Sequence, residues 1–145
     1  MTLSILTPPP GEPISLDEAK AYLRVTIDAE DALITSMITA ARQRVEAEIG
    51  LALLSTAFRQ TFDRPPDGPI ALLRGPLVSV EAVAVSESGG FIALDPSAYR
   101  PTLGDTQPRI APVNLVWPAP TSPVDGLRTT TPPGSGRAPT PCRGR

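Results

Sequence analysis

The sequence has 145 residues, enough for a single domain, and its 13 basic and 15 acidic side chains leave a net charge of −2. It contains no histidine and one cysteine, Cys142. These absences exclude Ser–His and Cys–His nucleophile pairs, internal disulfides and cysteine zinc sites, so we expect no catalytic residues, no metal and no cofactor. The charge balance also argues against affinity gained by neutralising phosphates.

Proline divides the chain into a foldable middle and two ends unsuited to long helices. Of the 19 prolines, four lie in residues 1–13, ten lie from Pro101 onward, and none lies between Ile14 and Arg64. No apolar run approaches the roughly 20 residues of a membrane span, and the N-terminus lacks the basic region of a signal peptide. We therefore expect no membrane association and, by default, a cytoplasmic protein.

An extended arm, residues 1–13, and a short capped helix are expected to open the chain. In the arm, the three consecutive prolines Pro8–Pro10 favour polyproline II. Ser15 and Glu18 have the spacing of a capping box, in which each side chain satisfies the other residue's backbone N–H. This motif predicts a helix over about residues 15–24.

A longer amphipathic helix is predicted over about residues 29–49. Asp28 has the position of its N-cap, and Glu30 and Asp31 fall in its first turn, where the helix dipole favours negative charge. Gly50 supplies the stop. An apolar stripe repeats at helical spacing, and its members are Leu33, Ile34, Met37, Ile38, Ala41, Val45 and Ile49.

Beyond this helical hairpin, residues 14–50, the apolar period changes to that of strands, which predicts a β-rich region over residues 51–117. Polar and apolar residues alternate from Thr56 to Phe62. Ser88–Gly90 can turn the chain between two strands, so a β-hairpin is predicted there. Further strand candidates are residues 70–73, 99–100, 109–110 and 113–117.

The last segment, residues 118–145, is rich in Pro, Arg and Thr and is predicted to be disordered. From Arg128 to Arg145 it contains no Val, Ile, Leu, Met or aromatic residue and no acid. Such a stretch buries too little apolar area to offset the entropy lost on ordering. The expected fold class is thus α+β, with a helical hairpin, a small antiparallel β region that includes a hairpin, and a disordered tail.

The acidic cluster of Asp28, Glu30 and Asp31 has two interpretations. Neighbouring carboxylates can serve acid–base chemistry or hold Mg²⁺. Their positions at a helix start explain all three without a ligand, and we favour that interpretation. Ser86–Gly90 lacks the Lys-Ser/Thr pair of a phosphate-binding loop and leads into a strand, so a hairpin turn is favoured there.

Two further features have ordinary structural explanations. The charge pairs Arg42–Glu46 and Arg44–Glu48 have i,i+4 spacing, which is typical of a solvated helix face, although an interface can use the same charges. Trp117 is expected to be buried against the sheet rather than exposed as an anchor.

Five segments together carry a family resemblance. A Leu-x-Glu-Ala-Lys-x-Tyr-Leu-Arg motif is present at Leu16, Glu18, Ala19, Lys20, Tyr22, Leu23 and Arg24. A Glu/Asp-Asp-x-x-Ile…Ala-Ala-Arg…Val-Glu pattern follows at Glu30, Asp31, Ile34, Ala40, Ala41, Arg42, Val45 and Glu46. Later matches are residues 73–77 with Val80 and Val83, residues 95–100, and Trp117-Pro118. In this order and spacing they resemble the head–tail connector (adaptor) family of tailed phages, prophages and gene transfer agents, over about residues 13–125.

The resemblance implies a structural subunit that forms a ring beneath the portal, extends the DNA channel and docks the stopper or tail. DNA would pass without sequence-specific binding, and the protein would lie in the virion at the head–tail junction after assembly in the host cytoplasm. A ring subunit needs complementary surfaces and no catalytic residues, which suits the composition. We expect the assembly interface on the polar face of the long helix and on the β-hairpin, at Arg42, Arg44, Glu46, Glu48, Gly89, Gly90 and Phe91.

The C-terminus departs from the family pattern. Members continue after Trp-Pro with a strand resembling Tyr-Thr-Ala-Gly-Phe-Gly, then Val-Pro and a final pair of helices, where this chain has RTTTPPGSGRAPTPCRGR. We hypothesise a frameshift near Arg128, because codons for Thr131–Gly136 read one base earlier can encode Tyr-Thr-Ala-Gly-Phe-Gly. The family's C-terminal helices would then be absent. An unbroken gene frame with no helical reading frame downstream would contradict this hypothesis.

Two other functions stay open at this point. A non-catalytic interaction module outside a phage would use the helical hairpin for another partner, and the genomic neighbours distinguish it, because portal, protease and capsid genes are expected beside a connector. A small carboxylate- and metal-dependent enzyme would use Asp28–Asp31. In that case metal would raise the thermal stability, and Asp31→Asn would remove the effect.

Overall fold

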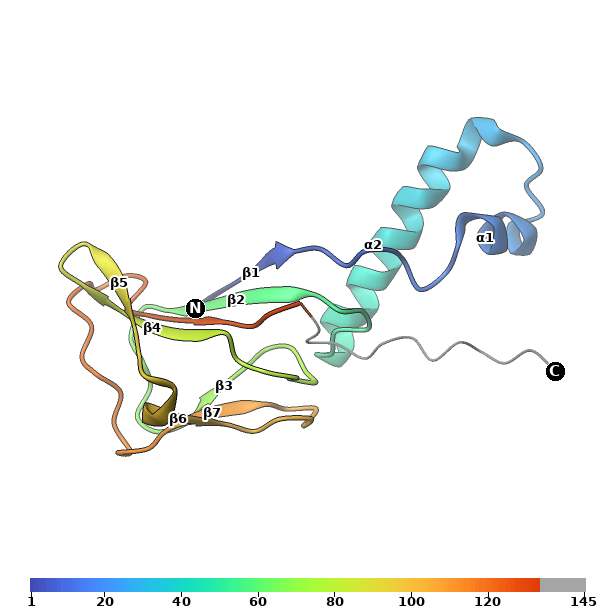
Figure 1. Cartoon of the computed structure of the whole chain (residues 1–145). Coiled ribbons are helices and arrows are strands. Elements are labelled where there is room, and N and C mark those ends of the chain that lie inside the picture. The colour runs from blue at the N-terminus through green and yellow to red at the C-terminus, as the bar shows by residue number, and fades with distance from the viewer. Residues whose placement is uncertain (134–145) are drawn as a thin grey trace.

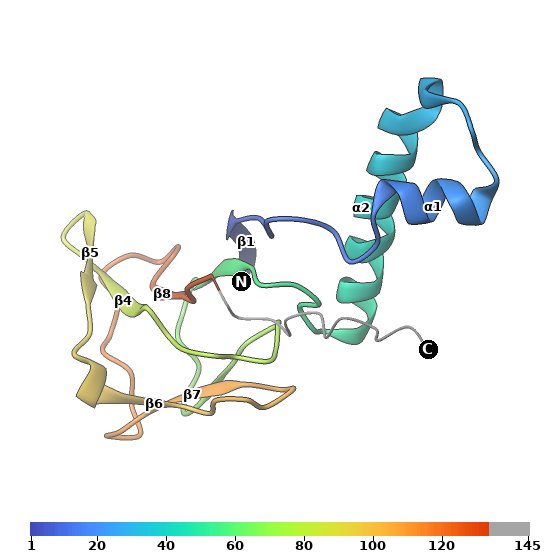
Figure 2. The same ribbon diagram turned by 45° about the vertical axis from the view of Figure 1, so that its right-hand side comes forward.

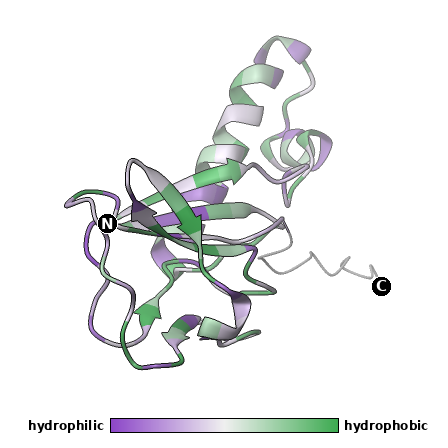
Figure 3. Cartoon of the chain, turned by 60° about the vertical axis from the view of Figure 1, so that its left-hand side comes forward, coloured by the Kyte–Doolittle hydropathy of each residue, from purple (hydrophilic) through white to green (hydrophobic). Residues whose placement is uncertain are grey.

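The computed structural model describes residues 1–133, in which two helices project from one end of a β-rich part (Figure 1). The two helices and the antiparallel sheets confirm the predicted α+β class. Figure 2 shows that the first helix lies across the second rather than along its full length. Both helices carry hydrophobic and hydrophilic stretches, as the hydropathy colouring shows (Figure 3).

Helix α1 spans Leu16–Leu23 and begins with the predicted capping box. The Glu18 amide donates to Ser15 Oγ at 3.2 Å, and the Ser15 amide donates to Glu18 Oε2 at 2.8 Å. Arg24 ends the helix in the left-handed region, with φ 58°. These bonds satisfy backbone groups that a short helix otherwise leaves without partners.

Helix α2 spans Asp31–Ile49 and is preceded by a 3₁₀ helix, Asp28–Glu30. Gly50, with φ 68°, ends it as predicted. The prediction that Asp28 caps α2 is wrong, because its side chain binds Lys20 of α1 instead. Lys20 Nζ lies 2.7 Å from Asp28 Oδ1 and 2.6 Å from Asp31 Oδ1. The acidic turn therefore joins the two helices electrostatically.

A five-stranded antiparallel sheet has the order β1-β2-β8-β4-β5. Its strands are β1 Thr2–Thr7, β2 Ala57–Phe62, β8 Leu127–Thr130, β4 Ala82–Glu87 and β5 Gly90–Ala93. Within the predicted extended arm, residues 1–13, strand β1 pairs with β2, a pairing that the sequence did not predict. Proline begins only at Pro8, so the residues before it keep the amides that the ladder needs.

A smaller sheet of order β3-β7-β6 lies on the other side of the core (Figure 1). Its strands are β3 Ile70–Ala71, β7 Arg109–Pro112 and β6 Tyr99–Pro101, and a 3₁₀ helix, Pro96–Ala98, precedes β6. The strand predicted over residues 113–117 is wrong, because the chain leaves the sheet at Pro112 and turns.

The hydrophobic core fills the space between the two sheets. Its buried residues are Phe62, Ile70, Val83, Val85, Tyr99, Ile110, Trp117 and Leu127. Trp117 is 5% exposed and its Nε1 donates to the Gly68 carbonyl at 2.8 Å, so the prediction that it is buried is confirmed. The helices contribute little to this core, and most of their apolar stripe lies outside it.

Strand β8 corrects the predicted disorder of residues 118–145 over the part that the structure describes. Leu127 and Thr129 are buried in the middle of the large sheet, between β2 and β4. Thr131 donates its amide to the Phe58 carbonyl at 2.9 Å, and its hydroxyl accepts from the Phe58 amide at 3.1 Å. Threonine suits strands and satisfies its own hydroxyl here, which a count of apolar residues overlooks. Residues 134–145 of the predicted tail lie outside the described residues.

Candidate assembly interface

Arg42 and Glu46 lie on α2 as predicted, but they are buried rather than on a solvated face. They are 6% and 7% exposed. Arg42 Nη1 lies 2.8 Å from Glu46 Oε2, and Arg42 Nε lies 2.7 Å from Oε2 of Glu12, which belongs to the segment between β1 and α1. The i,i+4 spacing is the same in both environments, so spacing alone does not reveal the burial.

This ion network joins three segments of the chain. Glu12 also accepts from the Thr39 hydroxyl at 2.8 Å, and Glu46 Oε1 accepts from the Leu53 amide, beyond the end of α2, at 2.9 Å. The hydrogen bond from Arg42 lowers the pKa of Glu12 below its ordinary value. The same bond raises the pKa of the Arg42 guanidinium, whose burial acts in the opposite direction. The network thus fixes α2 to the segments that enter and leave the sheet.

The other predicted pair, Arg44 and Glu48, lies on the solvated face of α2. Its nitrogen–oxygen distance is 3.6 Å, and the two side chains are 83% and 75% exposed. Such a pair contributes little to folding and stays available to a partner. The structure therefore separates the four predicted charges of α2 into an internal pair and an external pair.

The predicted hairpin residues lie at the far end of the large sheet from α2 (Figure 1). Ser88 and Gly89 form the turn between β4 and β5, with φ 45° and 86°. Gly89, Gly90 and Phe91 are all exposed, and the Arg128 guanidinium lies over the Phe91 ring, 3.6 Å from its centroid. The hairpin and the charges of α2 are thus two separate surfaces.

The acidic cluster shows an ordinary ion-pair arrangement. The hydrogen bond from Lys20 lowers the pKa of Asp28, and the same contact raises the pKa of Lys20. Within residues 1–133, no group of three or more His, Cys, Asp or Glu side chains is placed to hold a metal ion.

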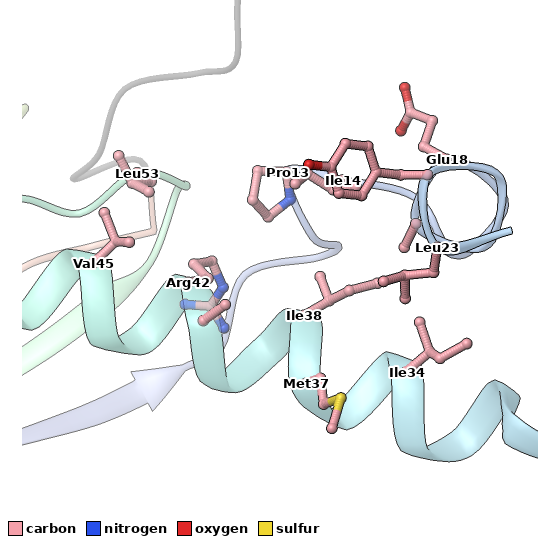
Figure 4. A pocket seen from close by; sticks show the side chains of 13 residues that line it. Pro13, Ile14, Glu18, Leu23, Ile34, Met37, Ile38, Arg42, Val45 and Leu53 are labelled. Carbon is pink, nitrogen blue, oxygen red and sulfur yellow. The ribbon is translucent and has the colours of Figure 1, made fainter. Parts of the chain in front are cut away.

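Sequence reasoning missed an apolar groove of about 820 Å³ between α1 and α2 (Figure 4). Tyr22 and Leu23 of α1 line it and are 88% and 54% exposed, and Met37 of α2 is 56% exposed. Its other lining residues are Pro13, Ile14, Glu18, Ala19, Ile34, Ile38, Ala41, Arg42, Val45 and Leu53. The predicted apolar stripe of the long helix contributes to this groove, and Met37 and Val45 stay exposed among residues 1–133.

A second hollow of about 660 Å³ adjoins the groove and shares Leu53 with it. Leu77, which is buried, and the exposed side chains of Val78 and Leu103 contribute to its wall. The apolar surface therefore continues from the helices onto the β-rich part. Exposed apolar surface of this extent is typical of a site that binds a partner.

The sequence matches the family model of the phage gp6-like head-tail connector protein over residues 13–91. The chain belongs to this family. The matched residues run from the start of the helical part to the beginning of β5, so they include both helices, the groove and strands β2 and β4 of the large sheet. No curated protein matches the connector.

The fold of the connector is similar to chains in solved particles. One belongs to the neck of an empty gene transfer agent particle computed with C6 symmetry, with a TM-score of 0.77 and 24% identity over 96% of this chain and 74% of that chain. A second belongs to the virion of a native gene transfer agent particle, with a TM-score of 0.72 and 24% identity over 91% and 72%. A third, from a native neck computed with C12 symmetry, has a TM-score of 0.65 and 22% identity over 96% and 72%.

These likenesses extend the shared fold beyond the family match to β6, β7 and β8. Among residues 1–133, no helix is both long enough and apolar enough to cross a membrane. The chain thus belongs to a head-tail connector family and has a fold that is also found in particle necks. It also carries an exposed apolar groove between its helices.

Proposed function

We propose that this connector assembles as a ring beneath the portal of a phage, prophage or gene transfer agent particle. The ring extends the DNA channel and docks the stopper or tail. The family match over residues 13–91 carries the proposal, because it spans both helices and the hairpin rather than one short motif. The structural similarity to chains from gene transfer agent necks computed with C6 and C12 symmetry supports it.

The surfaces of the connector suit such an assembly. Arg44 and Glu48 form an exposed ion pair, the exposed turn at Gly89 and Gly90 ends the hairpin, and the apolar groove lies between the helices. Many modest contacts of this kind gain strength when they are repeated around a closed ring. With a net charge of −2, the connector has little general attraction for DNA, which then passes without sequence-specific binding.

Electron microscopy of the purified full chain, alone and mixed with the portal protein of the same genome, tests the proposal. We expect rings, or density bound to the portal at the head–tail junction. A chain that stays monomeric and ignores the portal at micromolar concentration would contradict it. Virions assembled in the host should contain the connector in their purified necks.

A further inference from the structure

Two arginines are neighbours on the outer face of the large sheet. Residues alternate between the two faces of a strand, and Phe62 and Leu127 point into the core. Arg59 and Arg128 therefore belong to the opposite face, which is turned away from the small sheet (Figure 1). Thr61 lies opposite Arg128 in the register of β2 and β8, so the two arginines are diagonal neighbours.

Neither arginine has an anionic partner within residues 1–133. The ion pairs formed there involve other residues. Arg59 and Arg128 are half-buried, and the enclosed Nε atom of each has no hydrogen-bond partner among the described residues. A half-buried cation without a counter-ion is unfavourable, and two neighbouring cations repel each other. An anion that contacts both guanidiniums would relieve both effects.

The side chains around the two arginines also suit an anion. The strand positions on the outer face contain no acidic residue. The residues opposite Arg59 on its two neighbouring strands are Ser4 and Thr130, which both carry hydroxyl groups. The Arg128 guanidinium lies over the Phe91 ring, 3.6 Å from its centroid. This stacking restrains the guanidinium, so less conformational freedom is lost when it binds.

The chemistry of the outer face favours a phosphate backbone over a protein surface. Protein interfaces bury apolar side chains at their centre and are depleted there in charge. Here the centre holds Arg59 and Arg128, with hydroxyl-bearing neighbours. Arginine, serine and threonine are among the side chains that contact phosphate oxygens without reading the base sequence, and the planar guanidinium matches the geometry of a phosphate.

We propose that the outer face of the large sheet is turned toward the channel, where Arg59 and Arg128 contact the phosphate backbone of the DNA. This inference rests on the proposed ring, and it names the surface of the connector that faces the DNA. Two contacts in each copy are weak, but they are repeated around the ring. The net charge of −2 is compatible with them, because it limits general attraction while a few local phosphate contacts let the DNA slide.

A binding measurement with a short random-sequence DNA duplex tests the contact. Rings of the full chain are titrated against the labelled duplex, and fluorescence anisotropy gives the affinity at several salt concentrations. The double variant Arg59→Gln/Arg128→Gln should bind about tenfold more weakly at about 0.05 M salt, and its plot of log affinity against log salt should be shallower by roughly 2, because each phosphate contact contributes about 0.9 to the slope. The charge-conserving Arg59→Lys/Arg128→Lys should keep most of the affinity. Circular dichroism verifies that each variant is folded.

The small sheet offers a matched control. Arg100 and Arg109 are also diagonal neighbours on adjacent strands, but both side chains are exposed. Arg100→Gln/Arg109→Gln makes the same change in net charge, and we expect it to leave the DNA affinity nearly unchanged. Equal losses for the two Gln double variants would show that the DNA responds only to net charge, which would overturn the inference.

Photo-crosslinking to DNA locates the contact by a second route. In a Cys142→Ser background, Ser4→Cys carries an azidophenacyl group beside Arg59, because Ser4 is the cross-strand neighbour of Arg59. The control is Ala71→Cys, since Ala71 is the exposed cross-strand neighbour of Arg109. We expect more crosslinked DNA from the Ser4→Cys chain. A yield no higher than that of the control would contradict the inference.

The outcomes separate this inference from the proposed function. Rings that form but do not bind the duplex overturn the DNA contact and leave the connector role intact. If Arg59→Gln/Arg128→Gln abolishes ring formation or portal binding while its DNA affinity is unchanged, the outer face belongs to a protein partner and the inference is wrong. A wild-type chain that never forms rings, with or without portal, contradicts both.

Discussion

Arg42 shows how a charged residue of α2 serves the fold rather than a partner. Its guanidinium contacts Glu12 and Glu46, and Glu46 in turn accepts from the Leu53 amide. A buried ion pair contributes little compared with an apolar pair of the same size, but removal of one partner leaves an uncompensated charge. The network therefore affects the free energy of unfolding most strongly when one of its charged residues is removed.

Arg42→Ala should lower the free energy of unfolding by about 3 kcal/mol, because Glu46 then stays buried without its cation. Urea denaturation followed by circular dichroism measures the change. Arg44→Ala is the matched control on the same helix, and it should cost less than about 0.5 kcal/mol because its pair with Glu48 is exposed. Equal losses for the two variants would show that Arg42 has no special role.

The Glu12 carboxylate should make the free energy of unfolding depend on pH in the acidic range. Its pKa in the fold lies below the ordinary 4.5, mainly because Arg42 donates a hydrogen bond to it. Its contribution is complete above pH 4.5 and is lost as the pH falls through the lowered folded pKa, because the unfolded chain then binds the proton more readily.

We therefore expect Glu12→Gln to reduce stability at pH 7 and to have a smaller effect near pH 3. Urea unfolding at both pH values measures the difference. An effect of Glu12→Gln that grows toward low pH would contradict the assigned direction of the pKa.

At the scale of elements, local signals predicted the helices and the hairpin well. The capping box at Ser15 and the stop at Gly50 are confirmed, because both depend on residues within one turn of each other. Strands β1 and β8 escaped prediction, because each is held by partners far along the chain. Thr131 bonds to Phe58, which lies 73 residues away. From composition alone, residues 1–13 resemble an extended arm and residues 118–145 resemble a disordered tail.

The candidate interface was predictable only in part. The exposed pair on α2 and the hairpin turn followed from spacing and turn chemistry, whereas the groove did not. An apolar stripe at helical spacing has the same appearance whether it meets a core or a partner. What separates the two cases is the crossing of α1 over α2, which leaves Tyr22 and Met37 uncovered.

Gly126→Ala should destabilise β8, the strand that was not predicted from the sequence. Gly126 directly precedes β8, and a Cβ atom there would collide with the Asp63 carbonyl and the Pro120 ring. We expect a loss of about 1–3 kcal/mol and a lower melting temperature, as in overpacked cores. Gly11→Ala is the control, because a Cβ at that glycine meets no atom within 4 Å. A melting temperature unchanged by Gly126→Ala would contradict the close packing of β8.

At the scale of the whole molecule, the connector exposes a continuous apolar surface along the groove between its helices and the adjoining hollow. Of its exposed charges, Arg44 and Glu48 pair with each other, whereas others such as Arg64 and Arg109 take part in none of the ion pairs formed within residues 1–133. Assembly should then depend on burial of apolar surface more than on attraction between charges.

Self-association should therefore persist when salt rises from about 0.05 M to about 0.5 M, a range over which exposed charges lose most of their attraction. Sulfate, which strengthens apolar burial, should increase it. Analytical ultracentrifugation at each salt concentration measures the association constant. A drop of tenfold or more across this range would point to an interface of charged residues, such as those on the solvated face of α2.

The central place of β8 also sets the order in which the molecule can fold. The helices and the β4–β5 hairpin use neighbouring residues and can form as soon as they leave the ribosome. Strands β2 and β4 must wait for residues 127–130, so each keeps an unpaired edge for most of synthesis. Late closure of this sheet makes folding slow, and it exposes the nascent chain to edge-to-edge aggregation until its last strand is in place.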